Sequence, residues 1–319
     1  MTLFFTPNPC IERTLHIPDF AALGSFRVSP AQTRVTAGGK GINAARVAVN
    51  LGAEVTSLAP VGFHQKSQLQ AFLAQDGVAG EWVEVEAATR TTLNLVHHGG
   101  VTEVVEAGNP LSLEDGARLI SRFEALLPAC ELAIIGGSYP LASPGETEFW
   151  HAHGARLCAL AARAGKRVFY DGNGPAWKRA VLSENPPWAI KPNLREASDL
   201  LGRALETPAH ERESVAELRA RGIEVVLLSC GARGLWLGFE GEIKWLGSPT
   251  IREVSAVGSG DSLVGAFAAK WSESGDVTEA ARWGVAAGAA NAARLEAARV
   301  QLDEVAALVG QVRVGGVRA

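Results

Sequence analysis

The chain has 319 residues, enough for one large α/β domain or two smaller ones, and its slight acidic excess of 34 Asp and Glu over 30 Lys and Arg favours neither nucleic-acid binding nor a membrane-surface role. Its four cysteines have no CxxC spacing, so neither a zinc site nor a disulfide framework is indicated. The N-terminus lacks the basic region of a signal peptide, and no apolar stretch approaches the roughly 20 residues that span a bilayer. We therefore expect a cytoplasmic protein.

Most of the chain alternates apolar, strand-like runs with helical stretches, but two strand-like stretches with internal turn residues, 12–36 and 91–106, break this alternation. The second resembles a hairpin that turns at Gly99 and Gly100. Short antiparallel strands inserted in an α/β chain suggest a small β lid that covers a site or a partner subunit. An edge hairpin without such a role is the alternative. Because an exposed strand edge often pairs with a second copy, the lid strands also predict a homodimer.

The segment TAGGKGINAARVAVNLG, residues 36–52, predicts a glycine-rich turn that leads into a helix. Three glycines within four residues indicate close contact with the backbone, and they bracket Lys40: Gly38, Gly39 and Gly41. Asn43 stands in the first helical turn, where its amide can both donate and accept, as a sugar hydroxyl requires. The alternative is an ordinary tight turn with a solvated lysine.

Further along, the apolar runs LAIIGG (132–137), RVFYDG (167–172) and EVVLLSCG (224–231) alternate with alanine-rich helical stretches such as 149–165. This alternation predicts an α/β fold with a mostly parallel sheet flanked by helices, which we assign to a single domain over residues 1–319. Each run ends in small or polar residues at the carboxyl edge of its strand. Open α/β sheets bind ligands at that edge.

The stretch AVGSGDS, residues 256–262, places glycines at the start of a helix whose apolar residues recur at helical spacing. Gly258 can supply a positive φ, and Gly260 lets the backbone approach a ligand closely. The unpaired N–H groups of a helix N-terminus carry partial positive charge and bind anions, phosphate above all. We therefore interpret this turn as a phosphate site.

Asp261 follows these glycines in the first turn of the same helix. In the functional interpretation its carboxylate accepts a hydroxyl proton while the N–H groups stabilise a phosphoryl group in transfer. In the alternative, Asp261 or Ser262 merely caps the helix, which is worth about 1 kcal/mol. A cap does not require two glycines and a small Ser259, because capping leaves the ligand side of the backbone unconstrained.

Six motifs in order resemble those of the ribokinase-type (PfkB) carbohydrate kinase family. GGKGINAAR and VGSGDS resemble its two signatures, and between them lie GGSYP (136–140), DGNG (171–174), KPNLREA (191–197) and SCGARG (229–234). The opening TPNPCIERT and the phrase GGKGINAARV are similar to the branch of phosphofructokinase-B, 1-phosphofructokinase and tagatose-6-phosphate kinase. The resemblance covers nearly the whole chain and implies a ribokinase-like fold.

The resemblance also implies roles for single residues. It makes Asp261 the catalytic base, with an anion hole formed by the N–H groups of Gly258, Ser259 and Gly260. It implies sugar contacts at Gly38, Gly39, Lys40, Asn43 and Ser138. It implies nucleotide contacts at Lys191, Asn193, Ser229, Gly231, Gly234 and, near the adenine, Asn291. Asn193 and Glu196 match an NxxE element associated with Mg²⁺, which a carboxylate can reach through water.

Each of these motifs also has a plain structural interpretation. KPNLRE reads as a helix start with Asn193 as cap and Glu196 in a capping-box position, and SCGARG reads as a turn between two strands. Taken singly, the capping box is the better interpretation. The order of the whole set favours the functional interpretation.

The acceptor side of the site is implied by the lid segments. In the phosphosugar branch, basic residues of the lid hold the acceptor's own phosphate, and Arg27 and Arg90 occupy matching places, where a planar guanidinium can bind two phosphate oxygens. Glu12 stands where the branch usually has Asp, so its contact with a sugar hydroxyl is longer by one methylene. This difference leaves the sugar preference open.

The sequence therefore predicts an ATP- and Mg²⁺-dependent kinase that phosphorylates a primary hydroxyl of a hexose phosphate. Fructose 1-phosphate, fructose 6-phosphate and tagatose 6-phosphate are equal candidates. The alternatives are a neutral-sugar or nucleoside kinase of the same superfamily and a non-catalytic sensor of sugar phosphates.

Overall fold

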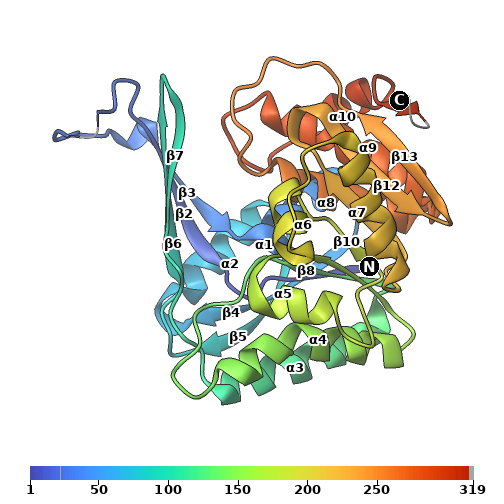
Figure 1. Ribbon diagram of the computed structural model, residues 1–319. Helices are drawn as coiled ribbons and strands as arrows, with labels where there is room; N and C mark the ends of the chain where they lie inside the picture. The colour runs from blue at the N-terminus through green and yellow to red at the C-terminus, as the bar shows by residue number, and fades with distance from the viewer. Residues whose placement is uncertain (22, 316–319) are drawn as a thin grey trace.

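A computed structural model describes residues 1–21 and 23–315 of the chain (Figure 1). Within these residues a 10-stranded sheet forms the centre of the molecule. In spatial order its strands are β14 (Arg313–Gly315), β13 (Glu242–Gly247), β12 (Gly234–Phe239), β11 (Val225–Ser229), β10 (Ala189–Ile190), β9 (Arg167–Asp171), β8 (Leu132–Gly136), β1 (Thr2–Phe5), β4 (Val55–Gly62) and β5 (Ala79–Val85). The strands from β11 to β5 run parallel, and β12, β13 and β14 are antiparallel.

Helices pack on both faces of this sheet, because its central strands carry buried apolar side chains on each side: Leu3 and Phe5 face one hydrophobic core and Phe4 faces the other. The core that contains Phe4 is closed by α1 (Lys40–Asn50), α2 (Lys66–Gln75), α8 (Ser259–Ser274), α9 (Val277–Ala292) and α10 (Leu302–Val309). The core that contains Leu3 and Phe5 is closed by α3 (Leu113–Leu126), α4 (Thr147–Arg163), α5 (Gly174–Val181), α6 (Leu194–Leu201) and α7 (Pro208–Ala220).

A second sheet of four strands stands to one side of the large sheet (Figure 1). Its order is β3 (Thr33–Gly38), β2 (Cys10–His16), β6 (Arg90–His97) and β7 (Gly100–Val105), with β2 and β6 parallel and the other pairs antiparallel. The fold prediction is thus confirmed: a mostly parallel sheet flanked by helices, and a separate small β-sheet.

The hairpin of the small sheet turns one residue earlier than the sequence predicts. His97 pairs with Gly100, so His98 and Gly99 form the turn and Gly100 is already the first residue of β7. Gly100 has a φ of 122°, a conformation that glycine adopts without steric cost. The glycine is therefore used at the end of the turn and not inside it.

Helices α1 and α8 cross at close range, and this crossing positions the site. A Cβ on Gly265 of α8 would lie 2.3 Å from the carbonyl oxygen of Ala44 in α1, so only glycine permits the approach. The crossing brings the first turns of both helices together. In the described part of the chain no helix is both long and apolar enough to cross a membrane.

Candidate active site

The amino end of α8 presents free backbone donors. Gly258 is its N-cap and has a φ of 80°, as the sequence predicts. The N–H of Ser259 donates to Ala256 O at 3.1 Å and that of Ser262 donates to Gly258 O at 2.8 Å. Among the described residues no acceptor takes the N–H groups of Gly258, Gly260 and Asp261. The N–H of Ser259, predicted for the anion hole, is thus used within the turn. The N–H of Asp261 is free in its place.

Asp261 itself is buried, with 8% of its surface exposed, and its Oδ2 accepts a hydrogen bond of 2.9 Å from Nδ2 of Asn43. Burial raises the pKa of the Asp261 carboxyl to about 6, against the opposing effects of Lys40, of the Asn43 hydrogen bond and of Lys191. A carboxylate with this pKa is ionised near neutral pH, yet it is basic enough to accept a proton.

Two lysines converge beside this carboxylate. Nζ of Lys40 lies 3.4 Å from Oδ1 of Asp171 and 3.8 Å from Glu196, and Nζ of Lys191 lies 3.3 Å from the same Asp171 oxygen. Burial lowers the pKa of the Lys40 ammonium, but the carboxylates of Asp171 and Glu196 outweigh it and raise that pKa overall. Lys40 therefore stays charged, as binding of a phosphate requires, and Lys191 shares its carboxylate partner.

Asp171 is a site residue to which the sequence motifs assigned no role, although it stands in DGNG. It is 2% exposed and ends β9, so it meets both lysines at the carboxyl edge of the sheet. An acidic residue at the end of a buried parallel strand was the available signal.

The glycines at the start of α1 serve mainly the packing of the protein. A Cβ on Gly41 would lie 2.3 Å from Oγ1 of Thr6 and 2.9 Å from the carbonyl oxygen of Phe5. Gly39 has a φ of 107°, and a Cβ on Gly38 would meet Oε2 of Glu12 at 3.0 Å. The close backbone contact that the sequence predicts is therefore made, at Gly41, with the protein's own β1 segment.

Glu12 lies on β2 beside Gly38, and burial raises the pKa of its carboxyl, with Arg46 acting in the opposite direction. Ser138 is half-buried in the loop after β8. This loop is held next to β9 by a 2.8 Å hydrogen bond from Gly137 N to Asp171 O. The structure thus keeps the Ser138 loop next to Asp171.

The two arginines predicted to bind the acceptor's phosphate lie in different surroundings. Arg90 donates from Nε and Nη2 to Asn8 O, at 3.3 and 3.1 Å, and from Nη1 to Glu106 O at 2.8 Å, so part of its guanidinium is engaged by backbone. Arg27 is exposed in the segment between β2 and β3, which extends away from the large sheet in Figure 1. The structure does not bring Arg27 together with the other predicted residues.

Asn193 and Glu196 form a reciprocal capping box at the start of α6. Asn193 N donates to Glu196 Oε2 and Glu196 N donates to Asn193 Oδ1, each at 2.9 Å. The plain interpretation of KPNLRE therefore describes their hydrogen bonds, while the second oxygen of Glu196 faces Lys40. Oxygen donors of this kind suit a hydrated Mg²⁺. The described residues contain no group of three or more His, Cys, Asp or Glu that could hold a metal by itself.

The loop SCGARG follows β11 and contacts the same edge. Ser229 N donates to Pro192 O at 2.9 Å, which joins this loop to the Asn193 turn. Gly231 has a φ of 61° with open space where a Cβ would stand, whereas a Cβ on Gly234 would lie 2.0 Å from Leu246 O. Gly231 thus faces solvent space that a ligand could enter, and Gly234 is explained by strand packing.

Asn291, which the family resemblance places near the adenine, lies inside the protein. It is 0% exposed and lies beneath the turn before α8. Its Nδ2 donates to Val257 O at 2.8 Å and to Ser259 Oγ at 3.0 Å, and its Oδ1 accepts from Ser262 Oγ and Ala298 N. With its polar atoms used inside the protein, Asn291 braces the phosphate-site turn.

A cavity of about 640 Å³ separates the small sheet from the segments that flank α8 and follow α9. Its lining includes Val96 and His97 of β6 on one side and Ile251, Arg252 and Leu295 on the other. The hairpin of the small sheet therefore faces the loops next to α8 across open space.

The fold is that of ribokinase-like sugar kinases, which transfer phosphate to an alcohol. A family model described as pfkB family carbohydrate kinase matches residues 17–303, and the chain belongs to this family.

Several solved structures are similar to the chain. Phosphofructokinase-2 from Escherichia coli, in complex with fructose-6-phosphate, is 26% identical, with 98% of each chain covered and a TM-score of 0.85. A possible 1-phosphofructokinase from Thermotoga maritima is 22% identical over 100% of both chains, with a TM-score of 0.90. Ribokinase from Giardia lamblia is 17% identical over 97% of this chain and 99% of its own, with a TM-score of 0.78. The last two likenesses concern the fold alone.

Proposed function

We propose that the protein transfers the γ-phosphoryl group of ATP to a primary hydroxyl of a hexose phosphate, with Asp261 as general base. The observation that carries this proposal is the convergence, at one helix end, of a buried carboxylate, free N–H groups and two lysines. Phosphoryl transfer passes through a loose transition state, so positioning and neutralisation of charge supply most of the catalysis.

Each group has a distinct task in this proposal. Asp261 accepts the proton of the attacking hydroxyl, and the N–H groups of Gly258, Gly260 and Asp261 donate to the phosphoryl oxygens. Lys191 and Lys40 balance the charge of the phosphates, and Asp171 holds both ammonium groups in place. Mg²⁺, held through water by Glu196 with Asn193 beside it, would neutralise charge on the ATP phosphates.

The nucleotide and the acceptor approach from opposite sides. We assign the nucleotide to the loop of Ser229 and Gly231, which ends at Gly234, where strand packing explains the glycine. We assign the sugar to Gly38, Gly39, Asn43, Ser138 and Glu12. Arg90 keeps donors beyond its three backbone bonds, which could bind the acceptor's phosphate. Fructose 1-phosphate, fructose 6-phosphate and tagatose 6-phosphate all place a phosphate and a primary hydroxyl at opposite ends of one sugar.

In this proposal the whole chain works as one unit and the small sheet is its lid. Closure over the cavity that separates it from residues 251–254 would exclude water from the reaction. Its edge strand β7 exposes Val104 and Val105, so we also propose a homodimer formed through the lid strands. Sedimentation equilibrium would give twice the monomer mass, and a monomer at all concentrations would contradict the dimer.

The function is tested by a screen for ADP release with ATP and Mg²⁺ over sugar phosphates and free sugars. Product should carry a new phosphorus resonance that the two protons of a CH₂ group split into a triplet, because the acceptor is a primary hydroxyl. A preference for free sugars or nucleosides, with a KM unchanged in Arg90→Ala, would instead favour a neutral-sugar kinase. Thermal stabilisation by sugar phosphates without ADP formation would indicate a sensor.

A further inference from the structure

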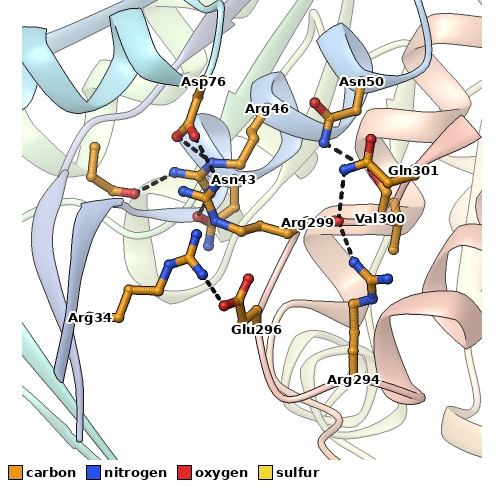
Figure 2. Close-up of polar contacts among 11 residues, drawn as sticks. Arg34, Asn43, Arg46, Asn50, Asp76, Arg294, Glu296, Arg299, Val300 and Gln301 are labelled. Carbon is orange, nitrogen blue, oxygen red and sulfur yellow. Dashed lines mark hydrogen bonds and ion pairs between the residues drawn. The ribbon is translucent and has the colours of Figure 1, made fainter. Parts of the chain in front are cut away.

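Arg46 of α1 lies behind the candidate base, separated from it by one side chain. Its guanidinium is 2% exposed and is held by three parts of the chain. Nε donates to Oδ2 of Asp76 at 2.6 Å, Nη2 donates to Ala37 O at 2.6 Å, and Nη1 donates to Oδ1 of Asn43 at 3.0 Å. Figure 2 shows this guanidinium between Asp76 and Asn43.

The contact with Asn43 has a direction. An arginine only donates hydrogen bonds, so the atom of Asn43 that faces Arg46 has to be the amide oxygen. The amide nitrogen is then turned toward Asp261 and donates to its Oδ2 at 2.9 Å. In the reversed orientation, two oxygens would face each other at Asp261 and two donors would face each other at Arg46.

We propose that Arg46 is a positioning residue that fixes the orientation of the Asn43 amide and thereby keeps the base ionised. This inference rests on the proposed role of Asp261. Arg46 touches no reacting atom. It acts through Asn43, because a hydrogen bond to the charged form of a carboxyl favours that form.

The geometry fits this task better than that of a simple ion pair. Asp76 already has a second cationic partner, since Nη1 of Arg299 lies 2.8 Å from its Oδ1 (Figure 2). Asp76 therefore keeps one counter-charge without Arg46. Oδ1 of Asn43 has no second donor of this kind, because among the described residues it accepts one hydrogen bond, from Arg46.

Other charged and titratable groups lie near Asp261: Lys40 of α1, Asp171 of β9, Lys191 before α6, and Cys10 of β2. Glu196 of α6 pairs with Lys40. Those around Arg46 are Asp76, Arg299 and Glu12. The test has to separate the orientation of Asn43 from the plain loss of a positive charge.

Arg46→Lys separates them. A lysine keeps the charge, but its single ammonium is drawn to the carboxylate of Asp76, so Oδ1 of Asn43 loses its donor. The measurement is the titration of the Asp261 carboxyl by ¹³C NMR of aspartate-labelled protein, with the resonance assigned by its absence in Asp261→Asn. We expect a midpoint near 6 in the unmodified protein and an increase of about one pH unit in Arg46→Lys.

Asp76→Asn is the matched control, because it keeps an acceptor oxygen for Nε and leaves Asn43 held. Its midpoint should stay close to that of the unmodified protein. An unchanged midpoint in Arg46→Lys, or an equal shift in Asp76→Asn, would overturn the inference.

If Arg46→Lys does not fold, the double variant Arg46→Met, Asp76→Asn replaces it, because it removes both buried charges. Its Asp261 midpoint should also rise, and an unchanged midpoint in this double variant would overturn the inference as well. The acid limb of kcat/KM should move with the NMR midpoint. The titration needs no turnover, so a protein inactive on all sugars would refute the proposed function and leave this result readable.

Discussion

The two glycine-rich turns of the chain are alike in sequence and different in use. Both lead into a helix at the same edge of the sheet, and each carries a charged residue: Lys40 stands among the glycines of the first turn, and Asp261 follows those of the second. At Gly41 the missing side chain makes room for Thr6 and Phe5 of the protein itself. At Gly260 a Cβ would meet only the end of Lys191, with Nζ at 3.2 Å. The first turn is closed by packing at Gly41, and the second is open to a ligand at Gly260.

This difference shows what a glycine motif can and cannot indicate. Gly-rich turns before helices signal close approach, but the sequence does not say whether backbone or ligand approaches. In this protein the closed turn fixes α1 and Asn43, and the open turn offers donors to a phosphoryl group. The two therefore respond differently to substitution.

The largest effect is expected at the open turn for Asp261→Asn. Turnover should fall by about 10² to 10⁴-fold, the range of general-base catalysis. Folding should be retained, because the amide oxygen introduced by this substitution can still accept from Asn43 and the burial of a charge is removed. Steady-state ADP formation and thermal melting at pH 8 measure both, and near-normal turnover would rule out Asp261 as the base.

Gly41→Ala addresses the closed turn and should act on stability. The new methyl group would overlap Oγ1 of Thr6 and crowd Phe5 O, an overpacking that costs about 1 to 3 kcal/mol in the free energy of unfolding. Urea unfolding at pH 8 reads this loss. Stability equal to that of the unmodified protein would mean that α1 does not pack on β1 as closely as described.

A smaller and graded effect is expected from pH. The pKa of Asp261 is raised to about 6, and the protonated acid cannot accept the hydroxyl proton, so kcat/KM should fall about tenfold per unit as pH drops below 6. The residual activity of Asp261→Asn serves as the control, because it should lack this limb. If kcat/KM fell in the same way below pH 6 in both proteins, the fall would belong to the titration of another group.

Much of the fold and part of the candidate site could be predicted from the sequence, at positions where the local sequence pattern and the chemistry of the side chains agree. The alternation of apolar runs and helical stretches indicates the parallel sheet, and the positive φ of Gly258 follows from its place in the turn. The contacts of Asp171, Arg46 and Asn291 depend on partners far away in the chain, so local pattern does not reveal them, although the place of Asp171 at a strand end is a signal. Asn291, 0% exposed, meets Ser259 only after α9 has folded back along α8.

The claim that the end of α8 holds the phosphoryl group in transfer is tested most directly by Gly260→Ala, measured beside Gly41→Ala. We expect Gly260→Ala to melt no lower than the unmodified protein, because alanine favours the helix. We expect its turnover to fall about tenfold or more, because the methyl group displaces Lys191 and covers the free N–H groups. Full turnover in Gly260→Ala, with melting lowered as in Gly41→Ala, would contradict it.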